Sequence, residues 1–283
     1  MTRPKTNAPH ELENGARLPH PIRLFRRLTG CDHYHFGLFP SSPEASSGEE
    51  HADRLRDAMD RMAVSCVERL APGSRVLDVG CGMGGTAVQL AEWGFEVMAL
   101  DPARELIAFA RERPGKFPGS PRPEFYEGRL EDLELSAAFE LVLSIEALQH
   151  FGRLAAFFGA ARAVLAPAGR LSVFDLTLHG VPSSPARPFH SKDALLETAE
   201  AHGFELEGDI DLTARVRPTL ELLGSRLTEE RATLLTQNGD WHAAHGEDVE
   251  ALGNQLHLLA AAFDEGFLAY HQLDWRACRT PPR

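Results

Sequence analysis

A glycine-rich stretch constrains the fold of this chain more than any other feature of the sequence. Residues 76–87, VLDVGCGMGGTA, leave an apolar run, turn on Gly80, Gly82 and Gly84, and enter a helical pattern. Glycines at such a turn let a ligand lie against bare backbone, where a side chain would collide with it. Asp101 closes the next apolar run, where a carboxylate can accept hydrogen bonds from both hydroxyls of a ribose. The stretch therefore predicts a nucleoside-binding turn between a strand and a helix.

Short apolar runs alternate with helical patterns through the middle of the chain. Strands are expected at residues 75–79, 96–100, 139–145 and 169–178, around the segment EFYEG, and later at 204–213 and 266–277. Residues 216–264 have a helical pattern almost throughout, broken near QNGDW. Alternation with short connections predicts an open α/β fold, Rossmann-like and doubly wound.

These patterns divide the chain into four parts. Residues 1–20 are expected to be a disordered tail, and residues 21–70 an N-terminal cap with the first helices. Residues 71–213 and 266–283 form the nucleoside-binding domain. The helical stretch 214–265 interrupts that domain between two late strands, so we interpret it as a lid over a substrate.

Composition excludes several classes of function. The net charge of −12 (29 basic against 41 acidic residues) argues against a nucleic-acid partner, which needs a basic face. Four cysteines without a CxxC pair indicate free thiols, and the N-terminus has no apolar signal segment. No apolar run approaches the roughly 20 residues that span a bilayer. We expect a cytoplasmic protein with no membrane partner.

The glycine stretch alone leaves the nucleoside open. Residues 80–85 also satisfy GxGxxG, so a nicotinamide or flavin dinucleotide is formally allowed. Asp78 argues against a dinucleotide, because a carboxylate two residues before the first glycine can receive a ligand ammonium group. About 70 residues also precede the stretch, whereas a nicotinamide fingerprint usually begins a domain.

The motif VLDVGCGMGGTA, the ribose-type Asp101 and the order of the last strands resemble the class I S-adenosylmethionine-dependent methyltransferases, over roughly residues 50–213 and 266–277. The resemblance implies a seven-stranded, mostly parallel sheet with an antiparallel last strand. It implies S-adenosyl-L-methionine as cofactor, with the glycines along its methionine and ribose moieties. The family often binds the adenine amino group with an acid at a position where this chain has Arg129. Because that position departs from the pattern, the adenine contact stays open, with Glu131 or Asp132 as substitutes. The expected cofactor residues are Asp78, Gly80, Cys81, Gly82, Gly84, Asp101, Pro102, Leu130, Glu131 and Ser144.

Three side chains at the ends of the fourth and fifth strands are candidates for acid–base chemistry. Glu146 and His150, in SIEALQHF, stand at i and i+4 and share one face if the segment is a helical turn. Asp175 ends the fifth strand, and an imidazole near carboxylates is a sensible proton acceptor. Related small-molecule enzymes direct the matching histidine and strand-five acid toward the acceptor. In carbon-methylating relatives, the acid matching Glu146 acts as the base.

Aromatic residues before the first long helix are candidates for the substrate pocket. The segment HYHFGLF resembles one that folds over the active site in relatives, so Tyr34, His35 and Phe36 are expected to close the pocket around a sulfonium. Phe151, Phe157 and Phe158 have a spacing that favours core packing. The late histidines, His242, His245, His257 and His271, complete no familiar ligand set, so no metal is expected.

We therefore expect a methyltransferase acting on a small-molecule, secondary-metabolite-like acceptor. A hydroxyl or amine acceptor with His150 as general base is favoured over carbon methylation of an alkene or aromatic ring with Glu146 as base. More distant alternatives are a methyltransferase acting on protein or nucleic acid, a silent nucleoside-binding module and an NAD(P)-dependent oxidoreductase. Several relatives are dimers, which leaves a homodimer open.

Overall fold

The structure is a computed structural model that describes residues 18–41, 51–113, 119, 121–132, 139–180, 189–237 and 239–278. Side chains are described for these residues except 20 and 232–246. Most of the expected tail, the polar segment before residue 51, and the side chains of His242 and His245 therefore lie outside the described residues. Within them, no helix is long and apolar enough to cross a bilayer.

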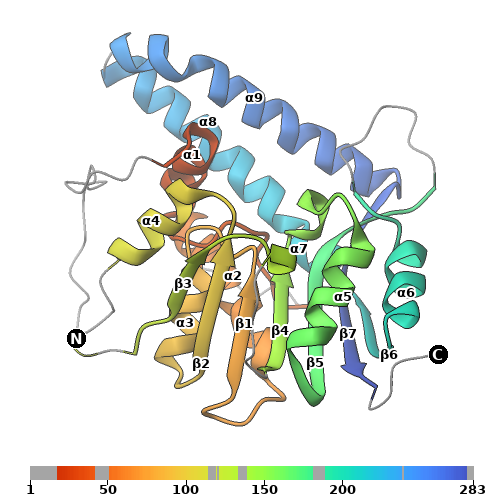
Figure 1. Ribbon diagram of the computed structural model, residues 1–283. Helices are drawn as coiled ribbons and strands as arrows, with labels where there is room; N and C mark the ends of the chain where they lie inside the picture. The colour runs from red at the N-terminus through yellow and green to blue at the C-terminus, as the bar shows by residue number, and fades with distance from the viewer. Residues whose placement is uncertain are drawn as a thin grey trace.

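A seven-stranded sheet forms the centre of the molecule (Figure 1), in the order β3-β2-β1-β4-β5-β7-β6. The pairs among β1 to β5 are parallel, and β7 runs antiparallel to both β5 and β6. This confirms the predicted fold class, including the antiparallel last strand. The strands are β1 (Arg75–Val79), β2 (Glu96–Asp101), β3 (Glu124–Glu127), β4 (Phe139–Ile145), β5 (Leu165–Leu178), β6 (Phe204–Asp211) and β7 (Leu268–Ala277).

Helices cover both faces of the sheet because its strands carry apolar side chains on both sides. On β1, Val76 belongs to one apolar core and Leu77 to the other, as the alternation along a strand requires. The helices are α1 (His20–Thr29), α2 (His51–Val67), α3 (Gly85–Glu92), α4 (Arg104–Glu112), α5 (Leu154–Val164), α6 (Lys192–Ala201), α7 (Thr213–Val216), α8 (Pro218–Gln237) and α9 (Gly239–Asp264), with 3-10 turns η1 (Leu130–Asp132) and η2 (Leu148–His150).

The first core packs under α2, α3, α8 and α9, and the second under α5 and α6. Phe157 and Phe158 are fully buried in the second core, which confirms that their spacing reflects packing. Ser191 accepts a hydrogen bond from the Ala194 backbone and caps α6, as the sequence predicts.

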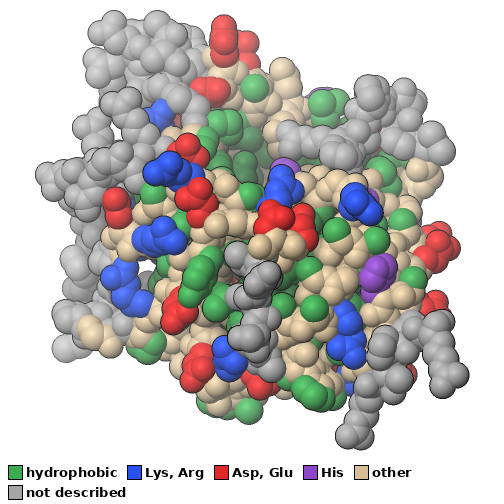
Figure 2. All heavy atoms as spheres, in the orientation of Figure 1, with side chains coloured by type: hydrophobic (Ala, Val, Ile, Leu, Met, Phe, Trp, Pro, Cys, Tyr) green, Lys and Arg blue, Asp and Glu red, His purple; other side chains and the backbone are tan. Residues whose placement is uncertain are grey.

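The long helices α8 and α9 lie side by side beyond the edge of the sheet where the parallel strands end, with α1 beside them (Figure 1). They account for the predicted helical stretch between β6 and β7. On the face drawn in Figure 2, acidic and basic side chains are interspersed rather than gathered by sign. The edge beneath the two helices is where an open α/β sheet binds its ligands.

Candidate active site

A cavity of about 600 Å³ opens at the carboxyl ends of β1, β2 and β4, beneath α8 and α9. Its size suits a site for small molecules. One end is bordered by the glycine loop, and the other by side chains from α1, α8 and α9. Eleven of the residues expected from the sequence line it: Tyr34, His35, Phe36, Asp78, Gly80, Cys81, Gly82, Asp101, Pro102, Glu146 and His150.

The three glycines of the loop have different roles. A Cβ on Gly80 would lie 2.4 Å from the Ala147 Cβ, and one on Gly84 would lie 2.7 Å from the Phe125 ring. These two residues are glycine because neighbouring elements pack against them. Gly82 has a φ of +54° and open space where its Cβ would be, so its bare backbone faces the cavity.

Asp101 braces the loop from the end of β2. One carboxylate oxygen accepts a hydrogen bond from the Gly82 amide at 3.0 Å, and the other accepts one from the Ala103 amide at 2.8 Å. Burial raises the pKa of Asp101, whereas these two hydrogen bonds and the charge of His150 lower it. Each oxygen keeps acceptor capacity toward the cavity, because a carboxylate offers about four lone-pair sites.

Asp78 lies on the cavity floor with one carboxylate oxygen buried and without a hydrogen bond from any described residue. Burial and, to a lesser extent, the neighbouring charge of Asp101 raise its pKa to about 7. A buried, unpartnered carboxylate costs free energy unless a ligand satisfies it. The arrangement suits a cationic ligand group such as an ammonium.

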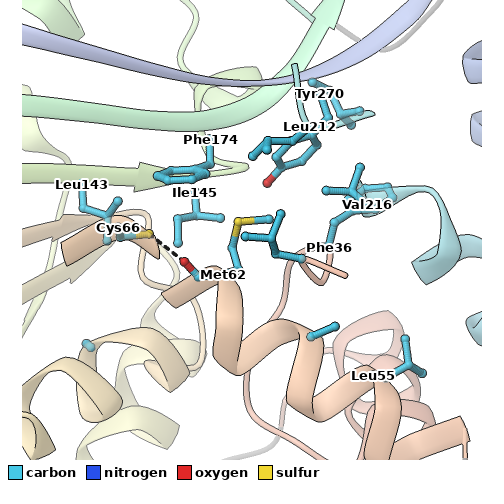
Figure 3. Close-up of a cluster of buried hydrophobic side chains, with 14 of the residues drawn as sticks. Phe36, Leu55, Met62, Cys66, Leu143, Ile145, Phe174, Leu212, Val216 and Tyr270 are labelled. Carbon is cyan, nitrogen blue, oxygen red and sulfur yellow. Dashed lines mark hydrogen bonds between the residues drawn. The ribbon is translucent and has the colours of Figure 1, made fainter. Parts of the chain in front are cut away.

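Glu146 lies at the junction of the N-terminal segment, β4 and β7. Its Oε1 accepts hydrogen bonds from the Phe36 amide at 2.6 Å and from the Tyr270 hydroxyl at 2.9 Å. Its Oε2 has no partner among the described residues. Burial raises the pKa of Glu146 to about 8, against the two hydrogen bonds, which favour the ionised form. Figure 3 shows Tyr270 beside Leu212 and Phe174 in the apolar core that fixes its ring.

The prediction that Glu146 and His150 share one face of a helical turn is wrong. Glu146 has a left-handed backbone (φ 53°) between β4 and the short turn η2, so the two side chains do not follow helical spacing. Glu146 points inward, whereas the His150 side chain is exposed at the cavity margin and close enough to Asp101 to affect its pKa. The left-handed backbone of Glu146, directly after β4, is the physical reason for the difference.

Asp175 is buried behind η2 rather than along the cavity lining. Its carboxylate accepts hydrogen bonds from the backbone amides of Leu148 and Leu176. Burial raises its pKa to about 7. In this geometry the side chain holds the turn that follows β4.

Four other expected residues lie outside the cavity lining. Gly84 packs on Phe125, Leu130 is buried in the second core, and Ser144 is buried with its hydroxyl lacking a partner among described residues. Glu131 also lies outside the lining, whereas Arg129 borders the cavity. The guanidinium of Arg129 and the carboxylate of Glu131 are 3.9 Å apart.

The segment around Tyr34 contributes a polar network that sequence reasoning missed. His33 contacts Asp60 of α2 at 3.1 Å, Thr86 of α3 at 3.2 Å and His35 at 3.2 Å. Burial lowers the pKa of His35 to about 3, so this imidazole is neutral. The HxH spacing was visible in the sequence, but its partners come from two distant helices. Tyr270 was missed for the same reason, since only the β5–β7 pairing brings it near Glu146.

Among the described residues, no group of three His, Cys, Asp or Glu side chains is arranged to hold a metal ion.

Comparison with known proteins supports the sequence resemblance. Residues 76–169 match the family model described as a methyltransferase domain. An O-methyltransferase from Pyrenophora dematioidea is 30% identical over 186 residues, which cover 60% of this chain and 69% of that protein. The methyltransferase GfsG from Streptomyces halstedii is 28% identical over 68% of this chain and 73% of its own length.

Among solved structures, the cyclopropane synthase MmaA2 from Mycobacterium tuberculosis has the same fold, with a TM-score of 0.73 and 21% identity. The match covers 91% of this chain and 98% of that one. These matches agree with the strand order of the sheet and with the glycine loop and Asp101 that line the cavity. The chain belongs to the class I S-adenosylmethionine-dependent methyltransferases that act on small molecules.

Proposed function

We propose that this enzyme methylates a hydroxyl group of a small molecule bound beneath α8 and α9, with Glu146 as the proton acceptor. The observation that carries the proposal is the carboxylate of Glu146, which lines the cavity, with Oε1 held by two donors and Oε2 without a partner among the described residues. A base held at one oxygen is oriented, and its other oxygen can take a proton. The relative from Pyrenophora dematioidea, named an O-methyltransferase, supports a hydroxyl acceptor.

The cofactor end of the cavity fits S-adenosylmethionine because it has hydrogen-bond acceptors that the described residues leave unpaired. The buried, unpartnered oxygen of Asp78 would bind the ammonium group, and Asp101 would bind the ribose hydroxyls. Gly82 leaves its backbone bare for the ligand. When bound, S-adenosylmethionine supplies an electrophilic methyl carbon and a positive charge that favours the ionised form of Glu146.

The chain's own residues then have distinct tasks. Tyr270 and the Phe36 amide stabilise the Glu146 carboxylate, which takes the proton that the acceptor hydroxyl loses. The two lid helices exclude water and align the acceptor, which is most of what an in-line displacement requires. His150, the base favoured by the sequence, is exposed and beside Asp101, so we assign it to the cofactor side.

Carbon methylation is a second candidate that uses the same carboxylate. Phe36 lines the cavity and its amide donates to Glu146, and an aromatic face stabilises a carbocation-like intermediate. Glu146 would then remove the proton after transfer. Mass spectrometry of the product separates the two candidates, because a C-methyl group survives treatments that cleave a methyl ether.

The test compares Glu146→Gln with His150→Gln in methyl transfer to a panel of hydroxyl compounds. The glutamine amide oxygen can still accept both hydrogen bonds, so folding should be preserved. We expect Glu146→Gln to lower kcat by roughly 10²- to 10³-fold, with unchanged affinity for S-adenosylhomocysteine. His150→Gln should change kcat by less than about threefold on the same scale. The reverse ranking would return the role of base to His150.

A further inference from the structure

The acceptor end of the cavity is formed by hydrocarbon side chains from three helices. They come from the first helix and from both lid helices: Phe25, Leu220, Leu223, Leu252 and Leu259. None of these carries a hydrogen-bonding group on its side chain. A ligand that fills this end therefore gains affinity by removing apolar surface from water, and a polar ligand surface would lose its hydration there.

Charge along the cavity is distributed unevenly. Of the described charged side chains that line it, four are carboxylates (Asp32, Asp78, Asp101 and Glu146) and one is a guanidinium, Arg129. Arg129 follows β3, beside the cofactor end, with Glu131 as its neighbour. Asp32 is paired with Arg26 and Arg113. At the acceptor end, Glu146 is thus the charged group among the described side chains, and no described cation faces it.

The apolar wall also contains an uncharged polar side chain. Gln255 of α9 borders the cavity, is half-buried, and makes no hydrogen bond with any described residue. By contrast, the Gln149 side chain donates to the Glu146 backbone carbonyl, and the Thr219 hydroxyl accepts from the Gly37 amide. With respect to the described residues, Gln255 can therefore still bind a ligand, whereas Gln149 and Thr219 are hydrogen-bonded within the protein.

We infer that the acceptor is an uncharged, mainly hydrocarbon molecule with one hydroxyl at Glu146 and a second neutral polar group at Gln255. Phosphate and diphosphate esters are excluded as acceptors. An anion at this end would lose its hydration without a compensating cation. The inference rests on the proposed function for the identity of the reacting group, but it concerns the chemistry of the whole acceptor.

Binding to the full chain loaded with S-adenosylhomocysteine tests the inference without turnover. Titration calorimetry would compare geraniol with geranyl phosphate and 2-naphthol with 2-naphthyl phosphate. We expect the neutral member of each pair to bind at least tenfold more tightly. Equal or tighter binding of the phosphates, or no binding of either neutral probe at millimolar concentration, would overturn the inference.

Two variants sharpen the experiment. Leu259→Arg adds a cation at the half-buried wall of α9 and should move the preference toward the phosphate member by about tenfold. Gln255→Leu should remove the advantage of 2,7-dihydroxynaphthalene over 2-naphthol while leaving 2-naphthol binding within twofold. An unchanged preference in Leu259→Arg, or an unchanged advantage in Gln255→Leu, contradicts the assignment of this wall.

Failure of this inference is distinguishable from failure of the proposed function. Neutral probes that bind but accept no methyl group would leave the acceptor class in place and remove the assigned reaction. Methyl transfer to the hydroxyl group of an alcohol that also carries a phosphate ester, in preference to neutral alcohols, would keep the reaction and remove the acceptor class.

Discussion

The two ends of the cavity are built in opposite ways. The cofactor end comes from one nearly continuous stretch, Asp78 to Ala103, and is bordered by backbone and carboxylates. The acceptor end joins α1, the segment around Phe36, the turn after β4, and helices α8 and α9. The first end depends on local chain geometry, and the second on tertiary packing. Substitutions should therefore separate cofactor affinity from acceptor chemistry.

The largest effect is expected at the cofactor end. Asp101→Ala should raise the Kd for S-adenosylhomocysteine about 100-fold, because hydrogen bonds to a charged group contribute about 1.5–3 kcal/mol each. Titration calorimetry measures the change. Glu124→Ala, which removes another carboxylate on the neighbouring strand β3, is the matched control and should leave the Kd within twofold. Equal losses in both variants would show a general effect of charge rather than ribose binding.

Two glycines of one loop should respond differently to the same added methyl group. Gly82→Ala places a Cβ in open cavity space and should weaken cofactor binding by about tenfold, with a strain of about 1 kcal/mol from its positive φ. Gly80→Ala drives a Cβ into Ala147 and should lower Tm more than it changes affinity. Melting curves with and without S-adenosylhomocysteine measure both quantities. If Gly82→Ala binds normally, the cofactor does not approach that backbone.

The substitution Tyr270→Phe tests the role of Glu146 at the acceptor end of the cavity. It removes one of the two donors to Glu146, so the pKa of that carboxyl should rise further and kcat near neutral pH should fall by about tenfold. Cofactor affinity should be unchanged because Tyr270 does not line the cavity. The pH profile of kcat separates this from simple misfolding, since activity should recover at higher pH. A uniform loss at every pH would contradict the role.

The smallest expected effect is a dependence of folding stability on pH. Burial raises the pKa of Glu146 from 4.5 to about 8, so the folded state keeps a proton that the unfolded state releases above about pH 4.5. The resulting stability is fully present below the unfolded pKa and is lost as pH rises through about 8. Tm of the free protein should fall by roughly 5 °C between pH 5 and pH 8.5. The Tm of Glu146→Gln should fall less over the same range, and an equal fall would assign the effect to other groups.

The sequence predicted the cofactor end of the cavity more completely than the acceptor end. The glycine loop and Asp101 were predictable because chain-local geometry requires those residues at that spacing. The cavity also includes Asp78, Glu146 and the segment around Phe36, as expected. The contrast between inward Glu146 and exposed His150 depends on one left-handed residue after β4, which periodicity does not encode.

The missed residues share a physical reason. Tyr270, Thr86 and Asp60 meet the site only through strand pairing and helix packing between segments far apart in sequence. A residue with an ordinary local pattern, such as a tyrosine in a buried strand, carries no sign of the carboxylate that it will contact. The residues of α8 and α9 were predictable as helical, but their leucines form a pocket wall only in the packed structure.

The position of β7 in the sheet has a consequence for how the enzyme folds during its synthesis on the ribosome. β7 is the last of the seven described strands in chain order, yet it lies between β5 and β6. While the polypeptide is being synthesised, the strands that carry the glycine loop can pair before β7 emerges. The edge of β5 must wait for β7, and Tyr270 reaches Glu146 only then. A nascent chain arrested before residue 268 would be ready to bind its cofactor before it could perform chemistry.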